Sequence, residues 1–348
     1  MVTHHVFLIP GFFGFVNFGK LVYFSHVREF LEDAFARERV PVEIHRVRLS
    51  PTSSLRVRAT ELLKFVRETA PAHAPLHLIG HSTGGLDARL FTTPGLTLDG
   101  ETDIEAHASR VRSVVSVASP HQGTPLAAFF SSIMGQQILR LLSFGTIIVL
   151  RRGRLPVGLM ARAAGRLARV AMRRETLPVA LLGALEAELL QNLGADQKEL
   201  IESFVRDVHG DQALMPQLVP AVMDVFESAT QDRPTTRYAC VTARAKPPRQ
   251  LARFGLGIAP WAQITYSLYT WLHHHVGPGD GIVPTASQRR GPVLFEAVGD
   301  HLDVIGHFDD ATHQPPHTDW ITTRSGFDRV QFEALWTEVA RFVAASAR

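Results

Sequence analysis

Short apolar runs alternate along this chain with longer segments in which apolar residues recur every three or four positions. The short runs predict buried β-strands, and the longer segments predict amphipathic helices. Strands are predicted over residues 3–9, 42–49, 76–80, 111–118, 236–243 and 293–298. Helices are predicted over residues 27–35, with Ser25 as the N-cap, and over 55–69 and 327–345, with a further helix directly after residue 82. This alternation predicts the α/β class, with a mainly parallel sheet flanked by helices on both faces.

Residues 126–233 interrupt the alternation. No run in this segment is a convincing strand, and apolar residues recur at helical spacing throughout. Because the segment lies between two predicted strands, it is expected to be a large helical cap or lid inserted into one α/β core. The predicted organisation is a first core part over 1–126, a cap/lid insertion over 127–235 and a second core part over 236–348.

The predicted insertion has an uneven charge pattern. Residues 129–150 are apolar apart from Arg140 and a few uncharged polar residues, eight arginines lie within 151–174, and 175–232 is acidic. In one interpretation the apolar stretch is a mobile lid, and the arginine face meets an anionic membrane or a lipid–water interface. In the other, the arginine-rich helix folds back on the acidic helices. The interruptions of the apolar run argue against a transmembrane helix.

Composition excludes some classes of protein. A net charge of +3 over 348 residues does not suggest a nucleic-acid binder. The single cysteine, Cys240, excludes an internal disulfide. The first residues lack the basic start and long apolar middle of a signal peptide. A cytoplasmic location is therefore the default expectation, with a secreted mature form as the alternative.

The predicted strand at 76–80 leads into a Gly-His-Ser-Thr-Gly motif at residues 80–84. This is the Gly-x-Ser-x-Gly pattern of a nucleophile elbow, in which a sharp strand-to-helix turn exposes a serine hydroxyl. Glycine at both flanking positions tolerates the close backbone approach that the turn imposes. Ser82 is therefore a candidate nucleophile. A tight turn without chemistry is the alternative.

An elbow serine needs a base and an acid that orients the base. Asp280 lies in a glycine-rich turn, and His301 follows the strand predicted at 293–298. The order serine, acid, histidine is the order of the α/β-hydrolase triad.

Five separated motifs carry a resemblance to bacterial triacylglycerol lipases and esterases of the α/β-hydrolase superfamily. They are Pro-Gly-Phe-Phe-Gly at 10–14, Gly-His-Ser-Thr-Gly-Gly-Leu-Asp-Ala-Arg at 80–89, Ser-Pro-His-Gln-Gly-Thr-Pro-Leu at 119–126, Asp-Gly-Ile-Val at 280–283 and Asp-His-Leu-Asp at 300–303. The resemblance implies an α/β-hydrolase fold. It also implies that Ser82 is the nucleophile, that Asp280 orients the imidazole of His301, and that His301 is the general base. The backbone N–H groups of Phe12 and Thr83 would then form the oxyanion hole.

Each assignment has a rival. Asp280 has the alternative of a simple turn residue, because Gly-Asp-Gly is favourable turn chemistry. The histidines that compete with His301 are His307, His313 and His317. Asp309 and Asp310 come too late in the chain to replace the acid easily. His81 is expected to pack beside the elbow, and His121 to support the loop below the site.

The remaining histidines and acids are candidate metal ligands. The run at 273–275 and the histidines after residue 306 lack the tight spacing of a zinc site. In the lipases that the chain resembles, an acid two residues after the catalytic histidine helps to bind a structural calcium, and Asp303 has that position. The expected upstream partner acid is missing, since no Asp or Glu lies between Arg233 and Gly279. We expect no cofactor and no metal, with calcium as the alternative.

The sequence thus predicts a serine carboxylester hydrolase of the lipase/esterase type that acts on apolar acyl esters through an acyl-enzyme on Ser82. A thioesterase or acyltransferase would use the same triad. A catalytically silent lipid-binding protein on this fold is the alternative from another class.

Overall fold

Six parallel strands form one sheet in the order β2-β1-β3-β4-β5-β6. The computed structural model describes residues 2–12, 23–98, 100–131, 211–246, 269–308 and 325–347. The strands are β1 (His4–Ile9), β2 (Val42–Arg46), β3 (Leu76–His81), β4 (Val111–Val117), β5 (Arg237–Ala243) and β6 (Val293–Ala297). Because all pairs are parallel, the carboxyl ends of the strands share one edge of the sheet.

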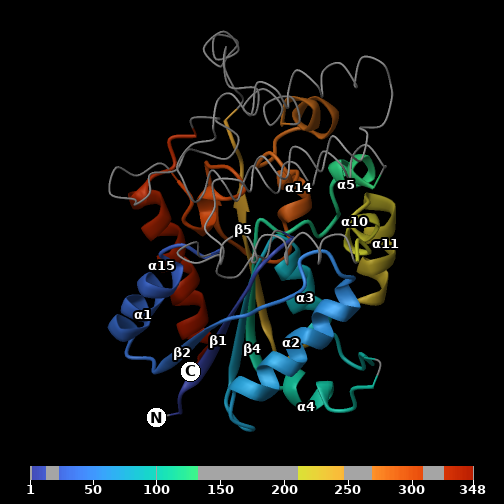
Figure 1. Cartoon of the computed structure of the whole chain (residues 1–348). Helices are drawn as coiled ribbons and strands as arrows, with labels where there is room; N and C mark the ends of the chain where they lie inside the picture. The colour runs from blue at the N-terminus through green and yellow to red at the C-terminus, as the bar shows by residue number, and fades with distance from the viewer. Residues whose placement is uncertain are drawn as a thin grey trace, which may run out of the picture.

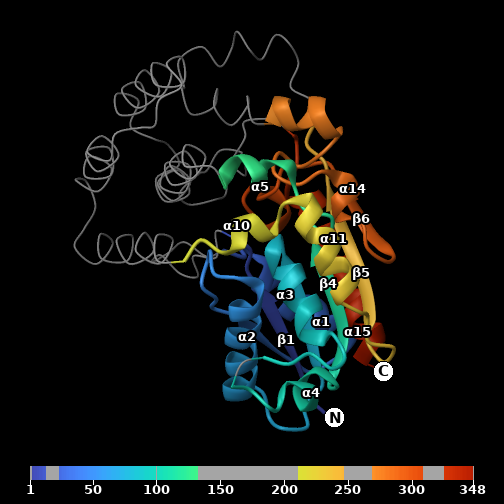
Figure 2. The ribbon, with the colours of Figure 1, turned by 90° about the vertical axis from the view of Figure 1, so that its right-hand side faces the viewer.

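Helices cover both faces of the sheet (Figures 1 and 2). On one face lie α1 (Val27–Glu38) and α15 (Arg329–Ala347), and on the other lie α2 (Leu55–Thr69) and α3 (Thr83–Thr92). Other described helices include α4 (Ile104–Ala108), α5 (Pro125–Phe130), α10 (Leu214–Gln217), α11 (Pro220–Ala229), α14 (Thr285–Gln288) and the 3-10 turn η1 (Asp303–Ile305). This two-sided cover confirms the predicted α/β class with a parallel sheet.

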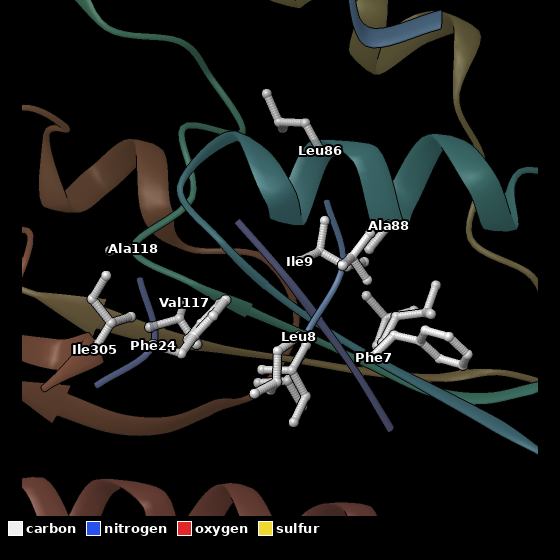
Figure 3. Close-up of a cluster of buried hydrophobic side chains, with 14 of the residues drawn as sticks. Phe7, Leu8, Ile9, Phe24, Leu86, Ala88, Val117, Ala118 and Ile305 are labelled. Carbon is white, nitrogen blue, oxygen red and sulfur yellow. The ribbon is translucent and has the colours of Figure 1, made fainter. Parts of the chain in front are cut away.

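The central strands are buried on both sides, which explains why they read as continuous apolar runs. Alternate residues of β1 point to opposite faces. Phe7 packs edge-on against Phe65 of α2, with ring centroids 6.2 Å apart. Figure 3 shows Leu8 on the side of the sheet away from α3, and Ile9 on the side of α3 with Leu86. The core is therefore two apolar layers with the sheet between them.

The predicted elements differ from the observed ones mainly at their ends. The second strand ends at Arg46, three residues before the predicted end. The prediction that Ser25 caps α1 is wrong, because the N-cap is His26, with φ 60° and no side-chain cap bond. A Cβ on Gly306 would lie 1.9 Å from the Ser25 carbonyl oxygen. The backbone at Gly306 thus packs closely against Ser25, which lies outside the helix.

The described parts of the predicted insertion, at its two ends, contain helices. Helix α5 leaves the core at the amino-terminal end of the insertion, and α10 and α11 return to it. The Leu55 N–H donates to Gln217 Oε1 of α10 at 2.9 Å, so this end packs on α2. Residues 132–210, including most of the apolar and arginine-rich segments, lie outside the described residues, so the domain division stays a prediction. None of the described helices is long and apolar enough to cross a membrane.

Candidate active site

Ser82 occupies a strained turn between β3 and α3. Its φ of 55° and ψ of −129° lie where non-glycine residues are rarely found. Its N–H donates to the Val117 carbonyl oxygen at 2.9 Å, which ties the turn to β4. Strain of this kind persists only when the surroundings fix it, and it concentrates at functional sites. The structure thus gives residue 82 the backbone that the elbow motif predicts.

The flanking glycines are needed because the backbones touch. A Cβ on Gly80 would lie 2.2 Å from the Gly84 carbonyl oxygen, and a Cβ on Gly84 would lie 2.2 Å from the Ile9 carbonyl oxygen. Gly11 is as restricted, since its Cβ would lie 2.5 Å from that of Ser82. The loop after β1 therefore passes directly beside the serine.

The proposed oxyanion groups lie on either side of this contact. Phe12 follows Gly11 directly and is buried. Thr83 is the first residue of α3, where a backbone N–H has no acceptor within the helix. The positive end of the α3 dipole adds to the attraction for an anion at this point.

Asp280 and His301 meet although they come from separate loops. The His301 Nδ1–H donates to Asp280 Oδ2 at 2.7 Å, and both side chains are almost fully buried. The other Asp280 oxygen accepts the N–H groups of Ile282 at 2.9 Å and Val283 at 2.7 Å. With Nδ1 protonated, Nε2 of His301 is left as the atom that can take a proton.

Gln288 on α14 stabilises the loop that holds Asp280, which we call the acid loop. The sequence analysis did not identify this glutamine. Its amide nitrogen donates to Asp280 Oδ2 at 3.1 Å and to the Val283 carbonyl oxygen at 3.0 Å. Its Oε1 accepts the Ala243 N–H at 2.6 Å, which ties α14 to the end of β5. No motif marks this glutamine, and only its complete burial distinguishes it.

A buried hydrogen-bond chain links the loop after β1 to the His301 loop. The Gly11 N–H donates to the Tyr23 hydroxyl at 2.9 Å, and that hydroxyl lies 2.6 Å from His81 Nδ1. His81 Nε2 lies 2.8 Å from the His301 carbonyl oxygen, which can only accept. His81 therefore donates from Nε2, and Tyr23 donates to Nδ1. Burial lowers the pKa of His81 well below its usual value, which keeps this tautomer neutral.

This hydrogen-bond chain also places His301 beside the elbow. The rings of His81 and His301 are 4.6 Å apart between centroids, and His81 directly precedes Ser82. Among the described residues, no hydrogen bond joins Ser82 to His301. Contacts between base and nucleophile are often long in unliganded enzymes and tighten around substrate.

The rival histidines are placed differently. His307 is buried, and its Nε2 lies 2.8 Å from the Tyr23 carbonyl oxygen. The described residue that bonds to the Asp280 carboxylate through a histidine ring is His301. Residues 309–324, which contain the other rivals, lie outside the described residues.

The Gly-Thr-Pro segment is bonded to the acid loop from below. Thr124 Oγ1 donates to the Ile282 carbonyl oxygen at 2.6 Å, and Ser287 Oγ donates to the Gly123 carbonyl oxygen at 2.7 Å. His121 Nε2 lies 2.9 Å from Ser116 Oγ, and burial lowers the pKa of His121 to about 3. The segment thus supports the turn that holds Asp280.

A buried ion pair braces the other side of the site. Arg58 of α2 and Asp87 of α3 are both completely buried and meet at 2.6 Å. Arg58 also donates to the carbonyl oxygens of Pro10 at 2.8 Å and Ser50 at 2.6 Å. One guanidinium therefore connects the helix after the elbow to the loop that holds Phe12. Sequence reasoning missed Arg58.

Asp303, the candidate calcium ligand, shapes the His301 loop. Its Oδ2 accepts the Asp300 N–H at 2.7 Å and the Ser325 hydroxyl at 2.9 Å. Asp303 is not part of any group of three or more potential ligands among the residues that the structure describes. The absence of calcium stays a prediction.

Two solved structures resemble the chain over nearly all of its length. A metagenomic carboxyl esterase is 17% identical, with a TM-score of 0.54, and the match covers 98% of this chain and 75% of the esterase. Lipase 1 from Pelosinus fermentans is 15% identical, with a TM-score of 0.56, and the match covers 99% of both chains. No protein-family model matches the sequence, and no curated protein matches it. The likeness confirms the predicted α/β-hydrolase fold.

Proposed function

We propose that the protein is a serine carboxylester hydrolase with Ser82 as nucleophile, His301 as base and Asp280 as the acid that orients it. The observation that carries the proposal is the combination of a strained serine with a buried Asp–His pair on the neighbouring loop. Neither feature requires the other for a structural reason. A tight turn forms without a neighbouring Asp–His pair, and an Asp–His pair forms without a strained serine.

In this mechanism His301 Nε2 takes the Ser82 Oγ proton as the oxygen attacks the ester carbonyl carbon. The N–H groups of Phe12 and Thr83 receive the oxyanion of the tetrahedral intermediate. His301 then returns the proton to the leaving alcohol, which leaves an acyl-enzyme. Water attacks the acyl group by the reverse route. The Asp280 carboxylate stabilises the imidazolium that forms twice in the cycle.

Apolar acyl esters are the proposed substrate class. The apolar sequence of residues 129–150 is the reason for proposing an acyl-chain pocket. The arginines of 151–174 are the reason for proposing contact with an anionic or lipid–water surface. The two similar structures are those of a carboxyl esterase and a lipase, which agrees with ester substrates.

The test is hydrolysis of p-nitrophenyl esters of increasing acyl length by the parent chain and by Ser82→Ala. We expect the variant to lose at least about 10³-fold in kcat, since it keeps only the oxyanion groups and the binding surface. Thr285→Ala is a matched control, because it also removes a hydroxyl near the acid loop. The Thr285 hydroxyl donates to the Ala243 carbonyl oxygen. Equal rates in the parent and in Ser82→Ala would overturn the proposal. Covalent labelling of Ser82 by a fluorophosphonate, located by mass spectrometry, gives an independent readout.

A further inference from the structure

Two histidines and a glutamate meet at the edge of the sheet where the strands begin, away from Ser82. His5 of β1 pairs in register with Glu43 of β2, and His45 lies two residues further along β2. All three side chains therefore point to one face. His5 Nδ1 lies 2.9 Å from His45 Nε2, and Glu43 oxygens lie 3.9 Å from each of these nitrogens.

Packing holds the two imidazoles in place. The ring of His45 packs against that of Phe7, with ring centroids 4.8 Å apart, and lies nearly parallel to that of His5, with centroids 5.1 Å apart. The side chains of His5 and His45 are 4% and 10% exposed, whereas that of Glu43 is 61% exposed. The two nitrogen ligands are thus held in position, and the exposed Glu43 side chain can rotate to bring its carboxylate toward them.

The chemistry of these three groups matches a divalent transition metal. Imidazole nitrogen suits Zn²⁺, Cu²⁺ and Ni²⁺, and two histidines with one glutamate are a known three-ligand set that leaves a position for water.

The separation of the two nitrogens favours some ions over others. At a metal–nitrogen distance of about 2.1 Å, nitrogens 2.9 Å apart subtend an angle of about 90° at a shared ion. This is the angle between neighbouring ligands in square or octahedral geometry, which suits Cu²⁺ and Ni²⁺. Tetrahedral Zn²⁺ would require the nitrogens to spread to about 3.4 Å.

We propose that His5, Glu43 and His45 form a binding site for a divalent transition-metal ion, with affinity in the order Cu²⁺, Ni²⁺, Zn²⁺. The ion replaces the N–H···N hydrogen bond between the two rings. The ring that donated this bond changes tautomer, so its proton moves to its other nitrogen and both ligands remain neutral imidazoles. It clamps the edge strand β2 to β1. This site is independent of the proposed hydrolase activity, since its residues lie at the opposite edge of the sheet from the elbow.

The same sheet contains a matched pair of histidines without a carboxylate. His4 Nδ1 lies 2.9 Å from His77 Nε2 on the opposite face, and His77 Nδ1 bonds to Ser113 Oγ at 2.7 Å. A hydrogen bond between two neutral rings therefore explains that pair completely. The carboxylate beside His5 and His45 is the feature that separates the two pairs.

The test is titration of the full chain, freed of metal by EDTA and dialysis, with Ni²⁺ in a calorimeter. We expect one tight site in the parent, at least tenfold weaker binding in His45→Ala and a smaller loss in Glu43→Gln. Glu43 is exposed, so Glu43→Gln keeps the fold even if His45→Ala disturbs it. With one equivalent of Cu²⁺, the electron paramagnetic resonance spectrum should show coupling to two imidazole nitrogens.

The exposed histidines 274 and 275 are the main alternative site for added metal. The double variant His274→Ala/His275→Ala should therefore bind Ni²⁺ as the parent does. Tight binding that survives in both His45→Ala and Glu43→Gln, or that disappears in the double variant, would overturn the proposal. An absence of tight binding in the parent would overturn it as well.

Discussion

At the scale of single residues, the site depends on side chains that never touch substrate in the proposed mechanism. Tyr23 is the clearest case, because its hydroxyl accepts the Gly11 N–H and donates to His81 Nδ1. Burial raises the pKa of Tyr23, so this group stays a neutral hydroxyl that donates one proton and accepts another. It positions two loops through one oxygen atom.

We expect Tyr23→Phe to lower kcat for ester hydrolysis about 10- to 100-fold with little change in KM. The loss leaves the Gly11 N–H and His81 Nδ1 without partners, and small displacements of catalytic groups have effects of this size. Steady-state kinetics on one p-nitrophenyl ester provides the measurement.

The matched control for Tyr23→Phe is Ser113→Ala. This variant also removes a buried hydroxyl bonded to a histidine of β3, at 2.7 Å, but at the far end of the strand. It should lose comparable stability and keep the parent kcat. If both variants lost kcat equally, general destabilisation would explain the effect and the positioning role of Tyr23 would be wrong.

At the scale of elements, α2, α3 and the loop after β1 are joined by the Arg58–Asp87 pair. Two charges without any solvent exposure are costly to bury, and their mutual attraction offsets the cost only while both are present. Arg58 donates to three residues, Asp87, Pro10 and Ser50, so the pair joins α2 to α3 and to the loop after β1.

We expect Arg58→Met to lower the free energy of unfolding by about 3–5 kcal/mol, because it leaves the Asp87 carboxylate buried without its partner. The double variant Arg58→Met/Asp87→Leu should recover most of this loss. Urea unfolding followed by circular dichroism measures both. An exposed pair on α1, Arg28 and Glu32, serves as control, and Arg28→Ala should change stability little. A double variant no more stable than the single one would contradict this account.

At the scale of the whole molecule, the sequence predicted what is encoded locally and missed what depends on register and packing. The strands and the elbow were predictable because apolar runs and paired glycines express requirements of the neighbouring backbone. Gln288 and Arg58 were not, since their partners lie on other elements and no spacing in the chain relates them. The cluster of His5, Glu43 and His45 likewise exists only once β1 and β2 pair in register.

Buried neutral histidines should make the whole fold sensitive to acid. Burial lowers the pKa of His77 and of His121 to about 3, while the unfolded chain titrates near 6.5. Below pH 6.5 these histidines bind protons in the unfolded state but not in the folded state. The free energy of unfolding therefore decreases as pH falls from 6.5 toward 3. Each histidine should remove about 2 kcal/mol between pH 7 and pH 5.

Urea unfolding of the parent and of His77→Gln at these two pH values checks this expectation. The variant should show a smaller difference between the two pH values by the share of one histidine. His275→Ala, at an exposed position, should leave the difference unchanged. An equal pH dependence in the parent and in His77→Gln would show that His77 titrates normally in the folded chain.

The strand order also has a consequence for the order of events during synthesis. The strands β2, β1, β3 and β4 are neighbours in the sheet and come first in the chain, so the frame around Ser82 can be complete once Val117 has been made. Asp280 and His301 follow about 200 residues after the serine, which a ribosome adds in about 10–40 s. In the proposed mechanism, the nucleophile is thus made long before its base. The proposed triad is complete only after residues 280–301 have been made and have folded onto the first part of the sheet.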